Sequence, residues 1–273
     1  MLHAELSGNS DTPGYAWVEE VLAQHEPSKG IPPKILRQTV QAMSGYLEGA
    51  SDPNTKRRVA SKIVHSREVV AATFDITALT PAVTWNMPQA LSIGLLHDIG
   101  RLEQASLGEF WHTHILLRHG VAGAKIAQRF DFSDTGVNQD TVITAIAKHD
   151  LTETGTENPY VMLVRDADKL ALFRNTVTSK FFPNRQTDGN LTPISPLVRA
   201  AFLTGRLVLN EHLATLSDEI VRMLAWNTDI SYPATRALIR NEHLIEGIED
   251  QLRASTGDLD PEIQLRINEM MQR

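Results

Sequence analysis

The stretch ALSIGLLHDIG, residues 90–100, decides the fold class of this 273-residue chain. Its first seven residues are apolar on every side, which is typical of a short helix at the centre of a core. Outward from it, apolar residues recur at helical spacing from Ile35 almost to the end, and few segments alternate as a strand would. The sequence therefore predicts an all-α protein.

The helical periodicity also divides the chain. We predict a lead-in of helices and loops over residues 1–50, one compact helical domain over 51–252, and a tail helix over 253–273. Asn158-Pro159 is a good helix start, with Asn as the N-cap and Pro in the first turn. Further helices are expected at Tyr15–Gln24, at Pro196–Trp226 and at Thr235–Leu252.

Composition excludes several kinds of protein. The 33 acidic and 26 basic residues give a net charge of −7, which argues against a protein whose main task is to bind nucleic acid. There is no cysteine, so disulfides, zinc–thiolate sites, iron–sulfur clusters and cysteine nucleophiles are excluded. No apolar run approaches the roughly 18 residues of a membrane span, and the segment Met1-Leu2-His3-Ala4-Glu5 lacks the basic-then-apolar layout of a signal peptide. We expect a cytoplasmic protein without a membrane partner.

The first candidate for chemistry is the pair His97-Asp98, which ends the most apolar helix. Burying an unpaired polar group costs about 2–7 kcal/mol, and a charge costs more, so both side chains need partners. One explanation is a hydrogen bond from the imidazole to the carboxylate that closes the helix. The other is a cation just beyond the helix end, held by both. The pair alone does not choose between them.

Three further histidines shift the balance towards a cation. His119 and His149 each share a helix face with apolar residues, and His65 lies at the edge of another apolar stripe. Four inward-facing histidines on four helices suggest a common target, and imidazole with carboxylate is the usual ligand set of a divalent transition metal ion. Further carboxylates come from Asp166 and Asp168, between which the periodicity does not choose.

The order His65, His97-Asp98, Asp168 resembles the HD superfamily of metal-dependent phosphohydrolases. Four ordered segments carry the resemblance, which covers about residues 56–252. LHDIGRLEQ (96–104) is similar to the HDIGRFEQ variant of a set of bacterial HD-domain hydrolases. HGVAG (119–123) resembles the family's H-x-x-x-G segment, AIAKH (145–149) its AIxxH segment, and RDADKL (165–170) its segment of the same sequence.

The resemblance implies an all-α HD-domain helical bundle with additional N- and C-terminal helices. It also implies one divalent ion held by His65, His97, Asp98 and Asp168, which makes Asp166 a surface or outer group. Members with additional histidines bind a second ion, at positions that match His119 and His149. The expected cofactor is thus one or two ions of Mn²⁺, Fe²⁺, Mg²⁺, Ni²⁺ or Co²⁺.

The sequence also departs from the family's pattern. Asp150 stands where Asn is usual, Leu102 replaces Phe, and Ala171 stands where many members have Asp. No Gly-Tyr-Pro signature follows the His-Asp pair, so the branch that hydrolyses cyclic-di-GMP is not supported.

The expected activity is metal-assisted hydrolysis of a phosphoester, in a nucleotide or a related small phosphorylated metabolite. Asp98 would orient the attacking water, and Arg101 and Lys169 would contact the phosphate. His119, unless it holds a second ion, would protonate the leaving alkoxide. His112 and His114 are further candidates for the pocket wall. A homodimer is compatible with the sequence.

Two other functions stay open. A few proteins of this fold with a similar ligand order hold two irons and oxygenate small substrates. A non-catalytic nucleotide sensor is the other alternative, although a degenerate sensor is expected to have lost ligands that this chain keeps.

Overall fold

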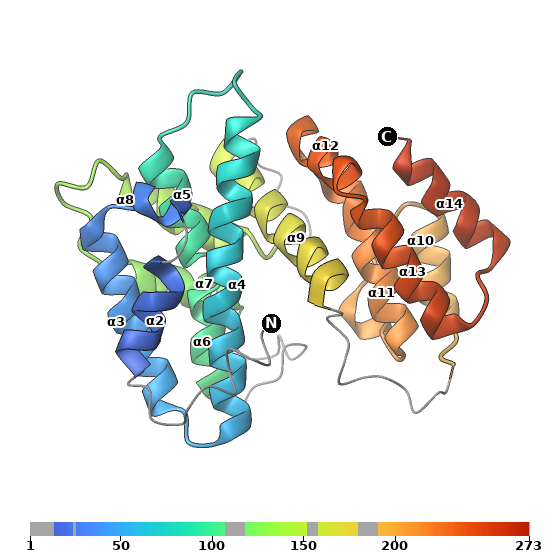
Figure 1. Cartoon of the computed structure of the whole chain (residues 1–273), viewed down its shortest axis with the longest axis horizontal. Coiled ribbons are helices and arrows are strands. Elements are labelled where there is room, and N and C mark those ends of the chain that lie inside the picture. Colours follow the sequence, from blue (N-terminus) through green and yellow to red (C-terminus); the bar gives the residue numbers. More distant parts are fainter. Residues whose placement is uncertain (1–13, 24–25, 107–117, 152–157, 180–190, 273) are drawn as a thin grey trace. The chain divides into compact units, whose positions relative to one another are not determined.

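The computed structural model describes residues 14–23, 26–106, 118–151, 158–179 and 191–272. Within these ranges the chain is built of α-helices and short 3₁₀ helices and contains no β-strand, so the all-α prediction is confirmed. Contacts divide the chain into two compact units, residues 1–171 (unit 1) and 172–273 (unit 2). Figure 1 shows both units in sequence colours.

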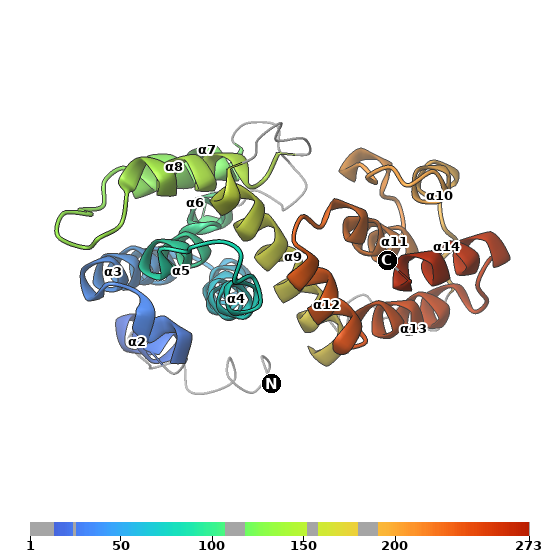
Figure 2. The ribbon, with the colours of Figure 1, turned by 90° about the horizontal axis from the view of Figure 1, so that it is seen from above.

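Unit 1 is a bundle whose longest helix is α4. Its elements are α2 (Gly14–Ala23), the 3₁₀ helix η1 (Glu26–Gly30), α3 (Pro33–Gly49), α4 (Pro53–Ala78), α5 (Met87–Leu96), α6 (Ile99–Ser106), α7 (His119–Ala127), α8 (Gln139–Lys148) and the first part of α9 (Pro159–Ser179). In Figure 2, α4 is seen almost end-on, and α7 and α8 lie side by side.

The apolar stretch that opened the sequence analysis forms α5, at the centre of unit 1. Asn86 caps the helix by accepting from the Gln89 amide, and every residue from Gln89 to Leu96 is buried. Since α5 packs against α4 and α8, its C-terminal end lies inside the core. This places His97 and Asp98 in the interior, with 0% and 5% of their surfaces exposed.

A close helix contact lies directly beyond that end. A Cβ at Gly100 in α6 would overlap the His119 carbonyl oxygen and the Gly123 amide of α7. Only a glycine lets the two backbones approach this closely. The glycine after the His-Asp pair thus brings the start of α7, and with it His119, towards Asp98.

The predicted start of α9 is confirmed, because the Asn158 side chain accepts from the amides of Tyr160 and Val161 and the helix begins at Pro159. The predicted helix at Tyr15–Gln24 corresponds to α2, one residue earlier at each end.

Unit 2 continues from the second part of α9. It contains α10 (Pro196–Leu203), the 3₁₀ helix η3 (Asn210–His212), α11 (Leu216–Ala225), the 3₁₀ helix η4 (Trp226–Asp229), α12 (Pro233–Asn241), α13 (Leu244–Thr256) and α14 (Pro261–Met271). The prediction of one helix over Thr235–Leu252 is wrong, because His243, with a φ of 53°, separates α12 from α13. The prediction of one helix over Pro196–Trp226 is also wrong. Gly205 has a φ of 69°, a left-handed conformation that cannot continue the helix, and α10 ends before it.

Asp218, fully buried in α11, ties the irregular segments of unit 2 to that helix. Its carboxylate accepts from the amide and hydroxyl of Ser195 and from the amides of Ala214 and Thr215. Thr215 and Asp218 also cap each other in a capping box at the start of α11. One carboxylate therefore holds the chain on both sides of the η3 segment.

The boundary between the units lies within α9, and neither predicted boundary, at residue 50 or 252, coincides with it. The predicted three-part division stays a prediction. None of the helices in the described ranges is both long and apolar enough to cross a bilayer.

Candidate metal centre

The six histidines and aspartates predicted as ligands all lie in unit 1, on five helices or their ends. His65 is in the middle of α4, His97 caps the C-terminus of α5, and Asp98 follows it. His119 is the first residue of α7, His149 caps α8, and Asp168 is in α9. Although up to 103 positions separate them in sequence, the fold brings these side chains together.

A first group consists of His65, His97 and Asp98, whose donor atoms lie within 4.8 Å of one another and are all buried. Asp168 joins it, because its Oδ1 lies 2.9 Å from His65 Nε2 and 3.8 Å from His97 Nε2. These are the four residues that the resemblance assigned to one ion.

A second group consists of Asp98, His119 and His149, also buried and within 4.8 Å of one another. The Nε2 atoms of the two histidines lie 3.2 Å apart, and they lie 3.4 and 3.6 Å from Asp98 Oδ1. Asp98 therefore belongs to both groups. Its Oδ1 faces His119 and His149, and its Oδ2 faces His97 at 3.7 Å.

The tautomers of two histidines follow from their backbone contacts. Nδ1 of His97 lies 2.8 Å from the Gly94 carbonyl oxygen, and Nδ1 of His149 lies 2.7 Å from that of Ile146. Because a carbonyl oxygen only accepts, both Nδ1 atoms carry a proton, and in the neutral rings Nε2 carries the lone pair. His97 Nε2 is buried and has no hydrogen-bond partner among the described residues. This nitrogen is therefore suited to coordinate a metal ion.

The protonation equilibria agree with this arrangement. Burial lowers the pKa of His97 to about 4, against the opposing attraction of Asp98 and Asp168, so the ring is neutral at pH 7. Burial also holds the pKa of His119 well below its usual value. Burial would lower the pKa of His149 too, but the facing Asp98 carboxylate outweighs it and raises that pKa. The negative charge of the Asp98 and Asp168 carboxylates thus favours a cation among these side chains.

Lys62 is a neighbour of the site that the sequence analysis missed. Its Nζ lies 2.8 Å from Asp98 Oδ2. Burial alone would raise the pKa of the Asp98 carboxyl, but the Lys62 ammonium and the facing imidazoles hold it well below its usual range. The signal was in the spacing, because Lys62 precedes His65 by three residues and so shares its helix face.

Asp150 is a second missed neighbour, although its place after His149 had marked it as a departure from the family. Its Oδ2 accepts from the Gly120 amide at 3.1 Å and lies 3.4 Å from His119 Nδ1. Arg118 pairs with its other oxygen. A carboxylate behind a ligating imidazole orients the ring and makes it a stronger ligand.

The remaining predicted residues have mixed outcomes. Arg101 lies at the edge of the group, with Nε 3.8 Å from Asp98 Oδ1 and a hydrogen bond to Gln104. Lys169 is buried in α9, and its role as a phosphate contact stays a prediction. Asp166 is fully buried, which excludes the helix surface, so its other predicted place, as an outer group of the site, stays a prediction. His112 and His114 lie outside the described residues.

Arg165, at the start of the RDADKL segment, has a positioning role. Its Nη1 donates to the carbonyl oxygens of His149, at 3.1 Å, and Leu151. It thus joins α9 to the end of α8, where His149 lies.

The family model of the HD domain matches residues 63–172, a range that contains all six side chains of the site. This segment of the chain is therefore similar to HD domains. No curated protein and no solved structure matches the chain. HD domains are generally metal-dependent hydrolases, and the buried histidine and aspartate groups within the matched residues of this chain could hold a metal ion.

Proposed function

We propose that this HD domain hydrolyses a phosphoester of a small phosphorylated metabolite, such as a nucleotide, with two divalent ions held by His65, His97, Asp98, His119, His149 and Asp168. The observation that carries the proposal is the position of Asp98, which turns one carboxylate oxygen towards each of the two ligand groups. A carboxylate in this position can serve two ions at once.

A bound divalent ion in such a site supplies an acidified water at neutral pH and offsets the negative charge of the phosphoryl oxygens. The chain's own residues supply orientation. Asp98 lies where it can accept a hydrogen bond from a water and orient it, and the buried walls exclude bulk solvent, which strengthens each electrostatic interaction.

Arg101 supports the choice of a phosphorylated substrate. Its Nε lies 3.8 Å from Asp98 Oδ1, and its side chain is 15% exposed, compared with 6% for Asp98. A guanidinium binds phosphate through two parallel hydrogen bonds, and a substrate phosphate is the partner that we assign to it.

The first experiment is a metal-supplemented screen of phosphoesters, including mononucleotides, dinucleoside polyphosphates and cyclic nucleotides, on the wild-type protein and His119→Ala. We expect hydrolysis of at least one class by the wild type. In His119→Ala we expect turnover to fall by ~10²-fold or more and the metal content to fall by about one ion per chain.

The matched control is His243→Asn, because His243 is exposed and lies far along the sequence in unit 2. It has a φ of 53°, a conformation that Asn tolerates, so metal content and turnover should equal those of the wild type. A His119→Ala protein that keeps its full metal content would contradict the two-ion arrangement.

Measurements on the same protein preparation distinguish the hydrolase from the two alternative functions. A di-iron oxygenase would contain iron and consume dioxygen with its substrate, and it would leave every phosphoester intact. A nucleotide sensor would bind one of the nucleotides without turnover. Either result would refute the proposed hydrolase.

A further inference from the structure

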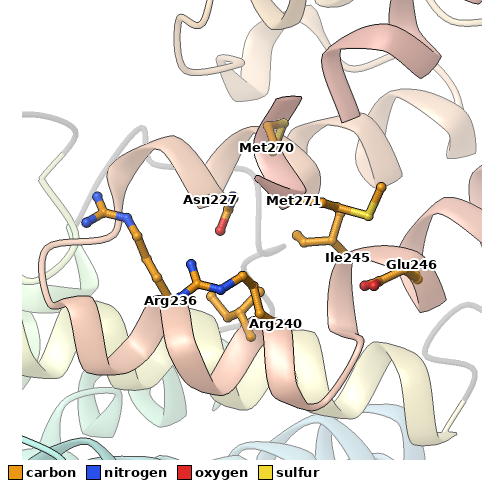
Figure 3. Close-up of a pocket in the computed structure, with 8 residues that line it drawn as sticks. Asn227, Arg236, Arg240, Ile245, Glu246, Met270 and Met271 are labelled. Atoms are coloured by element: carbon orange, nitrogen blue, oxygen red, sulfur yellow. The ribbon is translucent and has the colours of Figure 1, made fainter. Parts of the chain in front are cut away.

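Unit 2 contains a cavity of about 160 Å³ that no part of the proposed function uses. Its lining comes from η4, α12, α13 and the end of α14, all within residues 172–273. Figure 3 shows the residues that matter for its chemistry, which are Asn227, Arg236, Arg240, Ile245, Met270 and Met271.

One part of the lining is apolar. Ile245 and Met270 are buried, with 2% and 3% of their surfaces exposed, and Met271, which follows Met270 in sequence, also lines the cavity. Methionine side chains are flexible and polarisable, so they adapt to flat or irregular apolar groups. This part of the cavity suits a hydrocarbon or aromatic body.

The other part is cationic. Arg236 and Arg240 are four residues apart on α12 and therefore lie on the same face, and Figure 3 shows both guanidinium groups on the side where Asn227 lies. Arg236 donates from Nη2 to the Ile230 carbonyl oxygen, which holds its side chain in place. Within the described ranges, no hydrogen bond or ion pair involves the Arg240 guanidinium.

The nearby carboxylates are engaged with other partners. Glu242 accepts from Arg174 through both oxygens, at 2.8 and 2.5 Å. Glu269 pairs with Arg266 at 2.9 Å, and Glu246, at the edge of the cavity, lies 3.2 Å from His243 Nδ1. Two guanidinium groups four residues apart repel each other, and a bound anion would relieve that repulsion.

We propose that this cavity binds a small organic anion, with its phosphate or carboxylate group between Arg236 and Arg240 and its apolar body against Ile245, Met270 and Met271. A planar guanidinium donates two parallel hydrogen bonds to either group, whereas the Asn227 amide can donate to the ligand or accept from it. A largely apolar wall with a few converging polar groups is the usual design of a small-molecule site.

The test follows the methyl groups of ¹³C-labelled methionine by NMR in the whole protein. The chain has seven methionines, and Met270 and Met271 are assigned by replacing each with Leu. The probe is phenylphosphonate, which resists hydrolysis. We expect saturable shifts of the Met270 and Met271 signals with a Kd below about 1 mM. The Met223 signal, from α11, should not move.

Matched ligands separate the parts of the site. Benzoate tests a carboxylate in place of the phosphonate, and at least one of the two anions should bind. Phenol keeps the ring without the charge, inorganic phosphate keeps the charge without the ring, and both should bind at least ~10-fold more weakly than the better anion.

Matched variants test the arginines. Arg240→Gln should raise the Kd at least ~10-fold, because it removes a charged donor, and Arg240→Lys should have a smaller effect. Arg253→Gln is the control, since Arg253 pairs with Glu249 outside the lining. The proposal is overturned if both anions leave Met270 and Met271 unmoved, if phenol or phosphate alone binds as well, or if Arg240→Gln binds like the wild type. None of these results depends on whether the HD domain hydrolyses anything.

Discussion

Two buried aspartates, Asp98 in unit 1 and Asp218 in unit 2, lie in opposite kinds of surroundings. Asp218 accepts four hydrogen bonds of 2.6–3.0 Å, all from backbone amides and one hydroxyl of its own unit. Asp98 is faced by the Lys62 ammonium at 2.8 Å and by three imidazoles at 3.4–3.7 Å. Asp218 is therefore satisfied by hydrogen-bond donors of the fold, whereas Asp98 is surrounded mostly by side chains of the kind that bind metal ions.

The difference distinguishes a structural carboxylate from a functional one. Neutral amide donors hold a carboxylate without needing any other charge, so Asp218 stabilises the fold by itself. Imidazole nitrogens that point at a carboxylate without a hydrogen bond leave lone pairs such as that of His97 Nε2 unsatisfied. A buried polar atom without a hydrogen-bond partner costs folding free energy, and such atoms are concentrated at sites that bind a ligand.

The strongest test of this comparison is Asp98→Asn. Since loss of an outer partner alone costs about 10–100-fold in metal affinity, loss of the shared ligand should cost more than ~100-fold and abolish detectable hydrolysis. The thermal unfolding midpoint of the metal-free protein should change little. Metal analysis after dialysis, together with calorimetry, checks both parts. Wild-type metal content in this variant would mean that Asp98 is not a ligand.

Asp218→Ala should have the reverse effect. It leaves the amides of Ser195, Ala214 and Thr215 without their acceptor, and each unsatisfied buried donor costs about 1–3 kcal/mol. We expect unit 2 to lose on the order of 3 kcal/mol of unfolding free energy while metal content stays at the wild-type level. Urea unfolding followed by hydrogen exchange of the α11 peptides measures the loss. A stable Asp218→Ala protein would remove the distinction drawn above.

Asp150 allows a graded test on the outer side of the metal site. Asp150→Ala removes the group behind the His119 ring, and metal affinity or activity should fall about 10–100-fold. Asp150→Asn keeps an oxygen that can accept from His119 Nδ1 and from the Gly120 amide, so it should retain most of the activity. Equal losses in the two variants would show that charge, and not orientation, is what Asp150 supplies.

The smallest expected effect is a pH dependence of unit 2. Burial would raise the pKa of Asp218, but the hydrogen bonds from Ser195, Ala214 and Thr215 outweigh it and lower that pKa. The stabilisation is therefore fully present above the unfolded pKa of about 3.9 and is lost as the pH falls through the lower folded pKa.

This dependence can be measured by urea titrations between about pH 6 and pH 2.5, in a protein whose Trp17, Trp85 and Trp111 are replaced by Phe so that Trp226 is the only tryptophan that reports. The wild-type stability of unit 2 should decline below about pH 4. Asp218→Asn, which has no carboxyl to titrate, should lack that part of the decline. If the stability of the wild type and of Asp218→Asn declines in parallel, titratable groups other than Asp218 cause the decline.

The sequence alone predicted much of the fold and of the site. The all-α class, the central helix before His97 and the start of α9 at Pro159 are local properties, because periodicity and capping act over a few residues. The six histidines and aspartates came from apolar helix faces and from motifs in a fixed order. The failure at Pro196–Trp226 is equally physical, since apolar periodicity continued through a region where Gly205 ends the helix.

Other features required the tertiary structure. Periodicity places Lys62 on the His65 face but cannot show that it meets Asp98, 36 residues away. Asp166 and Asp168 differ by two positions, and only the packing of α9 buries the first and turns the second towards His65. Nor does any local pattern foresee the four partners of Asp218 or the cavity beside Arg240. Helical periodicity determines which face of a helix is buried, whereas distances between helices depend on how side chains from the whole chain pack together.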